Sequence, residues 1–170
     1  MPDFKPYPVL FPTRILQQLL RLATVLHDIG KIEVPLAILH KAGPLTSDEW
    51  NVMRSHAEAG YRILHNRGGI FSAIAPLVLT HHERWNGSGY PLGLRTDEIP
   101  LAARILAVVD SFDAMTEVRP YKGAYSYVDA CAELKRCAGV LYDPRVVKSF
   151  LSVMHTHSPF IEIATATIAA

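Results

Sequence analysis

The stretch RILQQLLRLATVLHD, residues 14–28, decides the fold of this chain. Its apolar residues recur with helical spacing around most of a helix surface, which is typical of a helix buried at the centre of a domain. Gly30 ends this helix just after the adjacent pair His27 and Asp28. Neighbouring helical side chains diverge by roughly 100°, so the pair can face one site only where the helix ends and the backbone turns. The stretch therefore predicts a central helix with a candidate site at its end.

Helical spacing continues along the rest of the chain, and no strand-like alternation competes with it. Thr46 and Glu49 form a capping-box pattern that opens a helix predicted to run to about Leu64. Further helices are predicted over residues 70–82, 101–115, 126–138 and 143–154. The stretch from Glu83 to Pro100 is predicted to be a long loop rich in glycine, and loops of this length are usually functional. The predicted fold class is all-α, a compact helical bundle.

Composition and charge narrow the classes of function. The chain has 170 residues, of which 49% are apolar and 19% charged, as expected for one globular domain with a continuous core. The net charge of +1 does not favour a nucleic-acid polymer or an anionic membrane, so phosphate recognition must be local. The apolar runs are too short to span a membrane. Cys131 and Cys137 suit neither a CxxC pair nor a disulfide framework, so we expect a reduced, cytoplasmic setting.

The chain is expected to divide into three parts. Residues 1–12 contain four prolines and are predicted to be an extended lead-in, because they lack the basic start and apolar block of a signal peptide. Residues 13–155 are predicted to form the folded domain. Residues 156–170 are predicted to be a tail, whose small residues from Ile163 to Ala170 favour disorder.

Histidines and aspartates at the ends of the apolar helices suggest a metal site. A carboxylate can bridge two cations while an imidazole fills a terminal position. For the pair at 27–28 alone, a histidine that favours the helix dipole beside a solvated aspartate is an equally good interpretation. His56 alone is more often a surface histidine than a ligand, whereas the adjacent His81 and His82 are hard to explain by packing. Asp110 follows an apolar run, and a buried lone carboxylate costs on the order of several kcal/mol unless it is paired or binds metal.

Taken together, these side chains favour a metal site over separate structural roles. Their nitrogen and oxygen atoms, without thiolates, suit Fe or Mn better than a structural zinc. The predicted metal ligands are His27, Asp28, His56, His81, His82 and Asp110.

Basic side chains close to these ligands predict a place for phosphate groups. Lys31 lies one helical turn beyond the His-Asp pair, and Arg119 and Lys122 follow the helix that carries Asp110. Arginine offers a bidentate fork and lysine a point charge. Asp113, one turn from Asp110, is placed to orient Arg119 or a water molecule. Surface ion pairing is the alternative for each basic residue taken singly.

The chain resembles the HD-GYP family of bacterial metal-dependent phosphodiesterases, a branch of the HD superfamily, from about Leu16 to Leu151. The motifs that carry the resemblance are HDIGK at 27–31, KAGPLT at 41–46, HHERWNGSGYP at 81–91, IPLAARI at 99–105, DSFDAMT at 110–116 and RPY at 119–121. In that family a helix upstream of the His-Asp pair donates a further histidine or glutamate ligand. Residues 1–12 contain neither, so the domain at 13–155 is expected to lack the family's first helix. Three alternatives follow: the chain is a fragment of a longer sensor or response regulator, the ligand comes from another chain, or the site holds fewer metals.

The resemblance implies hydrolysis of cyclic di-GMP, to linear pGpG or onward to GMP, at a site of two or three divalent metal ions in bacterial second-messenger signalling. It implies ligand roles for the six residues named above, and diguanylate cyclase or receiver and sensor domains as partners. The implied catalytic residues are Asp28, Lys31 and Asp113, and the implied substrate-binding residues are Lys31, Tyr90, Arg119 and Lys122.

The loop at 83–100 is expected to contribute to the binding site. Its glycines let the backbone approach a ligand closely, and Tyr90 or Trp85 offers a stacking face for guanine.

There are two alternatives to a phosphodiesterase that hydrolyses cyclic di-GMP. One is a signalling module of the same fold with weak catalysis. The other is an HD-type nucleotide phosphohydrolase acting on mononucleotides, against which the Gly89-Tyr90-Pro91 loop argues.

Overall fold

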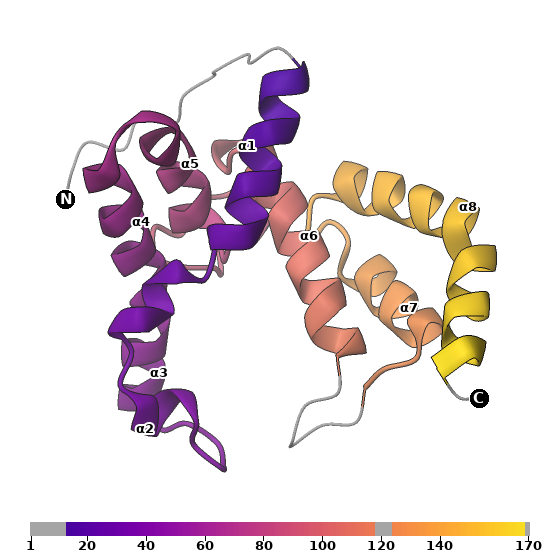
Figure 1. The fold of residues 1–170 in the computed structure, drawn as a ribbon, viewed down its shortest axis with the longest axis horizontal. Helices are drawn as coiled ribbons and strands as arrows, with labels where there is room; N and C mark the ends of the chain where they lie inside the picture. Colours follow the sequence, from indigo (N-terminus) through magenta and orange to yellow (C-terminus); the bar gives the residue numbers. More distant parts are fainter. Residues whose placement is uncertain (1–12, 118–123, 169–170) are drawn as a thin grey trace.

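The computed structural model describes residues 13–117 and 124–168, and the regular elements in these ranges are helices (Figure 1). Within the same ranges no strand forms, and the single β-bridge pairs Ala138 with Tyr142. The prediction of an all-α fold is therefore confirmed. The α-helices are α1 (Thr13–Leu26), α2 (Leu36–Leu39), α3 (Ser47–Arg54), α4 (His56–Arg67), α5 (Gly69–Thr80), α6 (Leu101–Thr116), α7 (Tyr127–Cys137) and α8 (Pro144–Ile168), and the 3-10 helices are η1 (Ile29–Glu33) and η2 (Thr96–Glu98).

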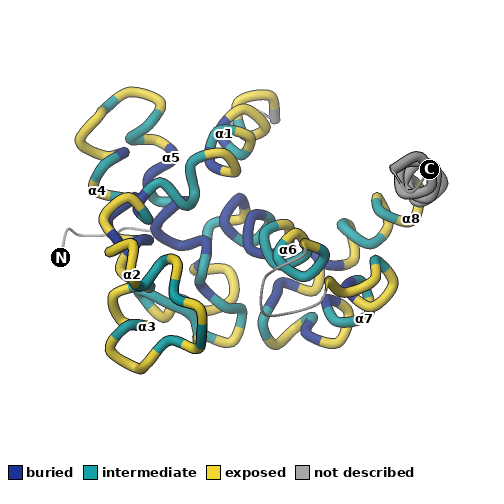
Figure 2. The backbone as a smooth tube through the Cα atoms, turned by 60° about the horizontal axis from the view of Figure 1, so that its bottom comes forward, coloured by how far each residue is buried: buried dark blue, intermediate teal, exposed yellow. Residues whose placement is uncertain are grey.

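The first core lies where α1, α4, α5 and α6 meet. Leu19 and Ala23 of α1 pack with Ile74 and Val78 of α5 and with Leu106 of α6, and all five are buried. Figure 2 shows that the buried backbone gathers toward the middle of the molecule, while the outer turns are exposed. The predicted central helix is thus α1, which ends at Leu26, two residues earlier than the predicted end.

The second core lies between α6, α7 and α8. Val108 of α6 packs with Leu134 of α7 and Val147 of α8, and Tyr142 between the last two helices joins them. Because α6 contributes to both cores, it holds the two halves of the helical bundle together. Cys131 is half-buried and Cys137 buried, and neither forms a disulfide. In the part of the chain that the structure describes, no helix combines the length and apolarity that crossing a membrane requires.

The helix predicted from Thr46 to about Leu64 is divided in two. Thr46 and Glu49 form the expected capping box, in which each side chain bonds the other residue's backbone N–H. The first part, α3, ends at Arg54, and α4 begins at His56. Between them the Ser55 hydroxyl donates to the Val52 carbonyl, and such a side-chain bond competes with the helical hydrogen bonds of the backbone. The prediction of one continuous helix was wrong for this reason.

The last helix is longer than predicted. Asp143 caps α8 as expected, since its carboxylate accepts from the Arg145 backbone N–H. The helix was predicted to end near Met154, but α8 continues to Ile168 and so includes most of the segment 163–170 that favoured disorder. The stretch 144–168 contains no glycine, so the usual C-terminal cap of a helix is missing from it. Figure 1 shows α8 bending along its length, and Pro159 lies within it.

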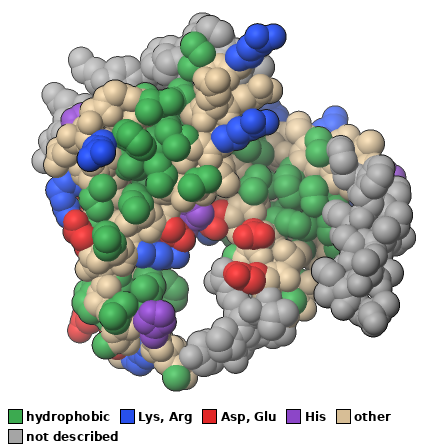
Figure 3. All heavy atoms as spheres, viewed as in Figure 1, with side chains coloured by type: hydrophobic (Ala, Val, Ile, Leu, Met, Phe, Trp, Pro, Cys, Tyr) green, Lys and Arg blue, Asp and Glu red, His purple; other side chains and the backbone are tan. Residues whose placement is uncertain are grey.

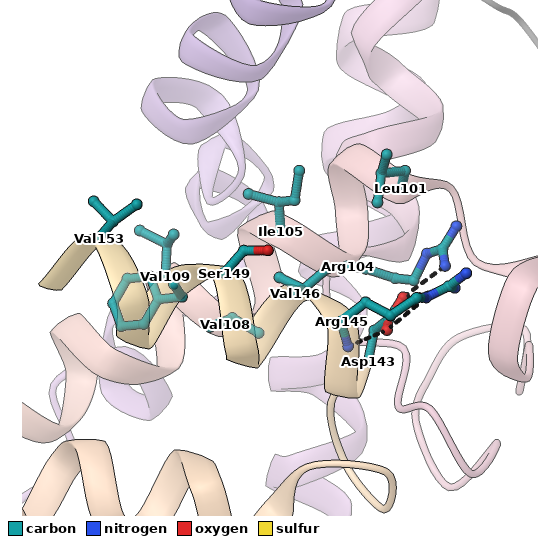
Figure 4. A pocket seen from close by; sticks show the side chains of 11 residues that line it. Leu101, Arg104, Ile105, Val108, Val109, Asp143, Arg145, Val146, Ser149 and Val153 are labelled. Atoms are coloured by element: carbon teal, nitrogen blue, oxygen red, sulfur yellow. Dashed lines mark hydrogen bonds and ion pairs between the residues drawn. The ribbon is translucent and has the colours of Figure 1, made fainter. Parts of the chain in front are cut away.

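A network of two arginines and two aspartates fastens α8 to the long loop and to α6. Figure 4 shows three of its members, Arg104, Arg145 and Asp143. The Asp143 carboxylate is inaccessible to solvent and accepts from Arg104 at 2.7 Å and from Arg145 at 2.9 Å. Both arginines also pair with Asp97, whose side chain is 70% exposed. Their guanidinium groups lie over the Trp85 ring, at 5.7 and 5.6 Å from its centroid. This network joins the loop residues Trp85 and Asp97 to α6 and to the start of α8.

A groove of about 570 Å³ lies between α6 and α8, and Figure 4 shows side chains that line it. Its walls are mainly apolar, with Ile105 and Val109 from α6 and Val146 and Val153 from α8. The groove includes none of the six predicted metal ligands. The candidate site therefore lies elsewhere.

We expect Asp143→Ala to lower the free energy of unfolding by about 3–5 kcal/mol, because it leaves the nearly buried Arg104 guanidinium without its buried partner. Urea denaturation followed by circular dichroism measures the change. Asp97→Ala is the matched control, since it removes an exposed partner of the same two arginines and is expected to cost much less. Equal losses in the two variants would contradict this account.

Candidate metal centre

The structure brings the six predicted ligands together from four segments that are far apart in the sequence. Figure 3 shows histidine, acidic and basic side chains gathered at a hollow between the α2–α3 segment and the end of α6. The pair at 27–28 follows α1, the pair at 81–82 follows α5, and single residues come from the start of α4 and the inner face of α6. These residues are His27, Asp28, His56, His81, His82 and Asp110.

Asp28 lies at the centre of the group. One carboxylate oxygen, Oδ1, is 3.5 Å from His56 Nε2, and the other, Oδ2, is 3.4 Å from His27 Nε2. The Nε2 atoms of His56 and His81 lie 3.5 Å apart. Asp28, His56, His81 and His82 each present a ligand atom, and these four atoms lie within 4.8 Å of one another. This spacing allows one cation to contact several of them at once.

Asp110 joins the group through His27. Its Oδ1 atom lies 3.5 Å from His27 Nε2, the same nitrogen that faces Asp28. The His27 ring also packs edge-on against the His81 ring, with centroids 5.2 Å apart. His27 thus lies between the two carboxylates, and all six side chains form one connected cluster.

The orientation of the imidazole rings fits a metal site. The Nδ1 atoms of His27, His56 and His81 each lie 2.6 to 2.8 Å from a backbone carbonyl oxygen three residues earlier in the chain. In a neutral ring, a hydrogen bond from Nδ1–H to a carbonyl leaves Nε2 as the nitrogen with a lone pair. In all three rings it is Nε2 that faces the other members of the cluster. The donor set and its supporting hydrogen bonds therefore suit a metal cation.

Burial keeps three of the histidines neutral. It lowers the pKa of His56, brings the pKa of His81 to about 4, and depresses the pKa of His82 to about 2. A neutral imidazole is the form that binds a metal, because a proton and a cation compete for the same lone pair. At neutral pH these three rings are consequently ready to act as ligands.

His27 and the carboxylates behave in the opposite way. The hydrogen bond to Asp110, followed by that to Asp28, raises the pKa of His27 to about 10. Burial pushes the pKa of Asp28 and of Asp110 upward, but the hydrogen bonds from His27, joined at Asp28 by Lys31, outweigh it and hold both pKa values below the usual range. The cluster therefore keeps two ionised carboxylates close to buried imidazoles.

The predicted phosphate-binding and positioning residues are only partly described. Lys31 lies in η1, and its Nζ atom is 2.5 Å from Asp28 Oδ2. Asp113 lies in α6 one turn beyond Asp110 and is exposed. Arg119 and Lys122 lie outside the described residues. The roles of these four side chains toward a substrate stay predictions.

Close backbone contact sets the position of the His-Asp pair. A Cβ atom on Gly30 would lie 1.9 Å from the His56 carbonyl oxygen and 2.5 Å from the Gly60 nitrogen. A Cβ atom on Gly60 would lie 2.8 Å from a methyl group of Val78 in α5. The segment after α1 can therefore touch α4, and α4 can touch α5, only because both contact points are glycines. This packing brings three ligand-bearing segments within reach of one another.

Glu83, which the sequence analysis did not single out, holds the long loop in its shape. Its buried carboxylate accepts hydrogen bonds from the backbone N–H groups of Leu92 at 2.7 Å, of Gly93 at 3.1 Å and of Leu94 at 3.1 Å. Burial is the largest influence on its pKa and raises it. A glutamate directly after two histidines and before a glycine-rich stretch was the one signal in the sequence that could have indicated this role.

The loop glycines serve the loop itself. The sequence analysis expected them to let the backbone approach a ligand, but a Cβ atom on Gly89 would lie 2.4 Å from the Arg84 nitrogen. A Cβ atom on Gly87 would meet the Arg95 side chain, and its φ of +79° favours glycine. At these two positions the close approach is to the protein's own chain, because the loop folds back on its beginning.

The two aromatic residues of the loop have different surroundings. The Tyr90 ring lies against the His82 ring at 4.8 Å between centroids, and burial raises the pKa of its hydroxyl to about 12. Tyr90 is thus beside the metal-ligand cluster, as its predicted role in binding requires. Trp85 instead lies beneath Arg104 and Arg145 in the network at the start of α8, which leaves it a structural role.

Comparison with known proteins places this geometry in a family context. The family model described as HD domain matches residues 10–146. The chain is 47% identical over 135 residues to a cyclic di-GMP phosphodiesterase of Thermotoga maritima, covering 79% of this chain and 37% of that protein. It is 47% identical over 135 residues to a cyclic di-GMP phosphodiesterase response regulator of Xanthomonas campestris, covering 79% and 36%. It is 39% identical over 130 residues to a 3'3'-cGAMP-specific phosphodiesterase of Vibrio cholerae, covering 76% and 25%.

The fold has a counterpart among solved structures. The crystal structure of a cyclic GMP-AMP specific phosphodiesterase of Vibrio cholerae superimposes with a TM-score of 0.64 at 18% sequence identity, over 86% of this chain and 40% of that one. At this identity the likeness concerns the fold. The chain spans between 25% and 37% of the length of the three relatives named above.

We expect Gly30→Ala to lower the free energy of unfolding by at least about 3 kcal/mol, because the added methyl group meets backbone atoms that have no room to move. The same change should weaken metal uptake, since it pushes the His-Asp pair away from His56. Thermal denaturation and elemental analysis measure the two effects. Gly43→Ala is the control, because a Cβ atom there has nothing within 4 Å, and it should leave both quantities unchanged.

Glu83→Gln should release the loop, because the amide group replaces one accepting oxygen with a donor that faces a backbone N–H. We expect a loss of roughly 1–3 kcal/mol in stability and faster amide hydrogen exchange at residues 92–94. The exposed Glu58 on α4 provides the control Glu58→Gln. Unchanged exchange at residues 92–94 in Glu83→Gln would show that the carboxylate does not hold the loop.

Proposed function

Because this chain belongs to the HD domain family, we propose that it is the catalytic domain of a metal-dependent phosphodiesterase that hydrolyses cyclic di-GMP to linear pGpG or onward to GMP. The observation that carries the proposal is the group of four ligand atoms on Asp28, His56, His81 and His82, all within 4.8 Å of one another. Two relatives at 47% identity are named cyclic di-GMP phosphodiesterases, which supports this choice of substrate.

The cluster suits the attack of water on a phosphodiester. Bound divalent cations would neutralise the anionic oxygens of the diester and lower the pKa of a water molecule between them. Asp28, with its two oxygens facing different histidines, is the carboxylate best placed to be shared between cations. Two or three cations of Fe or Mn would match the number and type of donor atoms.

The surrounding side chains would bind and position the substrate. Lys31, which contacts Asp28, adds positive charge beside one phosphate, and Arg119 and Lys122 would bind the second. Asp113 would orient Arg119 or a water molecule, and Tyr90 would form one wall of the site. No covalent intermediate is required, because the nucleophile is water. The described residues around the cluster provide acidic, basic and positively charged side chains.

The wider context of the domain follows from the family. We propose that it works in the cytoplasm, in second-messenger signalling, beside receiver or sensor domains or a diguanylate cyclase. The relatives are longer than the chain, which leaves room for such domains in them.

A second candidate substrate is 3'3'-cGAMP. The observation that favours it is a relative, 39% identical, that is named a 3'3'-cGAMP-specific phosphodiesterase. Both substrates carry two 3'–5' phosphodiesters and at least one guanine, so the metal cluster alone does not separate them. Rates of hydrolysis measured for cyclic di-GMP, for 3'3'-cGAMP and for mononucleotides distinguish the two phosphodiesterase activities from each other and from a mononucleotide phosphohydrolase.

We expect protein purified without oxygen to contain Fe or Mn and to convert cyclic di-GMP to a linear product. Asp28→Asn, which keeps the shape of the side chain, should reduce the rate by at least about 100-fold and lower the metal content, because the shared carboxylate becomes a poor ligand. Elemental analysis and chromatography of the products measure the two quantities.

His155→Ala provides the control, because His155 is an exposed histidine of α8 outside the cluster. It should retain both metal and activity. Metal-loaded protein that binds cyclic di-GMP and leaves it intact would contradict the enzymatic proposal and favour a signalling module.

A further inference from the structure

An arginine on α3 lies between two aromatic rings beside the metal-ligand cluster. The Arg54 Cζ atom is 5.8 Å from the centre of the Trp50 ring and 5.4 Å from the centre of the Tyr90 ring. Trp50 and Arg54 are four residues apart on one helix and therefore share a face. Tyr90 reaches the same point from the long loop. The two cation–π contacts fix the position of an exposed guanidinium group.

The contacts of Tyr90 connect this arginine to the cluster. The Tyr90 ring lies against the His82 ring, with 4.8 Å between centroids, and His82 belongs to the group of four ligand atoms. The backbone also connects Arg54 to the cluster, because Arg54 ends α3 and the ligand residue His56 begins α4 two residues later. Arg54 is thus separated from the cluster by one aromatic ring.

The hydrogen-bonding capacity of Arg54 is unused within the described part of the chain. Among these residues no carboxylate pairs with its guanidinium group and no acceptor takes a hydrogen bond from it. Three other cations have carboxylate partners: Lys31 contacts Asp28, and Arg104 and Arg145 pair with Asp143. Arg84 lies over the Tyr142 ring, at 5.3 Å from its centroid. A fixed guanidinium with free N–H groups next to a candidate catalytic centre is suited to a ligand with paired acceptors.

We propose that Arg54, held between Trp50 and Tyr90 beside the metal-ligand cluster, reads the O6 and N7 atoms of a guanine base of the substrate. The proposal rests on the proposed function and names the residue that selects the base. Arginine forms two parallel hydrogen bonds with these two acceptors, a pairing that adenine does not offer because it carries an amino group at position 6. The exposed Trp50 ring provides an apolar surface next to the same base.

The test compares cyclic di-GMP with its 7-deaza analogue, which lacks the N7 acceptor. In the metal-loaded wild-type protein we expect a KM and a dissociation constant about 10-fold or more higher for the analogue. Arg54→Ala should raise both constants for cyclic di-GMP and remove the difference between the two ligands, with little change in kcat. Calorimetry gives the dissociation constants independently of turnover.

Bis(p-nitrophenyl) phosphate, a diester without a base, reports on the metal cluster alone. The Arg54→Ala variant should hydrolyse this diester at the wild-type rate to within about 2-fold, because substitutions at exposed positions usually have small effects. Arg67→Ala, which changes an exposed arginine at the other end of α4, should leave every constant unchanged. An equal weakening of cyclic di-GMP and its 7-deaza analogue in Arg54→Ala, or an equal loss with the base-free diester, would overturn the proposal.

The outcomes separate this inference from the proposed function. Wild-type protein that hydrolyses neither diester would disprove the enzymatic proposal, while a dissociation constant that depends on both N7 and Arg54 would still support base recognition. Wild-type protein that hydrolyses both diesters, with no effect of Arg54→Ala on cyclic di-GMP, would sustain the enzyme and disprove the role of Arg54. Failure of wild-type protein to bind cyclic di-GMP would disprove both.

Discussion

The candidate site depends on backbone packing at two glycines. Gly30 lies directly against the His56 carbonyl and the Gly60 nitrogen, and Gly60 in turn lies against Val78. No other residue has so little volume, so no side chain separates the three ligand-bearing segments. The approach places Asp28 within 3.5 Å of His56. Interiors are packed too densely to absorb an added methyl group here, which makes the metal-ligand geometry a consequence of core packing.

Packing alone would leave an unfavourable cluster of polar groups inside the protein. Burial lowers the pKa of His81 and His82 and so favours their neutral imidazoles, and it opposes the ionisation of Asp28 and Asp110. His27 relieves part of this cost by donating to both carboxylates. Divalent cations would relieve more of it, because they can contact the neutral nitrogens and the ionised oxygens at the same time. The electrostatics and the backbone geometry thus point to the same ligand.

The loop and the second core give the site its outer parts. Glu83 closes the loop on itself, and the arginine network around Asp143 fastens the loop to α8. These contacts hold Tyr90 against His82, and Tyr90 then supports Arg54 from the other side. Stability and recognition are connected in this way. A loop that is held by buried hydrogen bonds can present an aromatic ring to a substrate in one position.

The sequence by itself determined the helical class, the end of α1 next to the His-Asp pair, the capping box at Thr46 and the types of ligand atoms, because each depends on residues within a few positions of one another. The motifs also indicated all six side chains of the cluster before their positions were known. Only the tertiary structure decided that α3 and α4 separate at Ser55, that α8 continues beyond Met154, and that Glu83 holds the loop. It alone brought Arg54 to Tyr90, since that contact joins two segments whose relative position depends on the packing of the whole bundle.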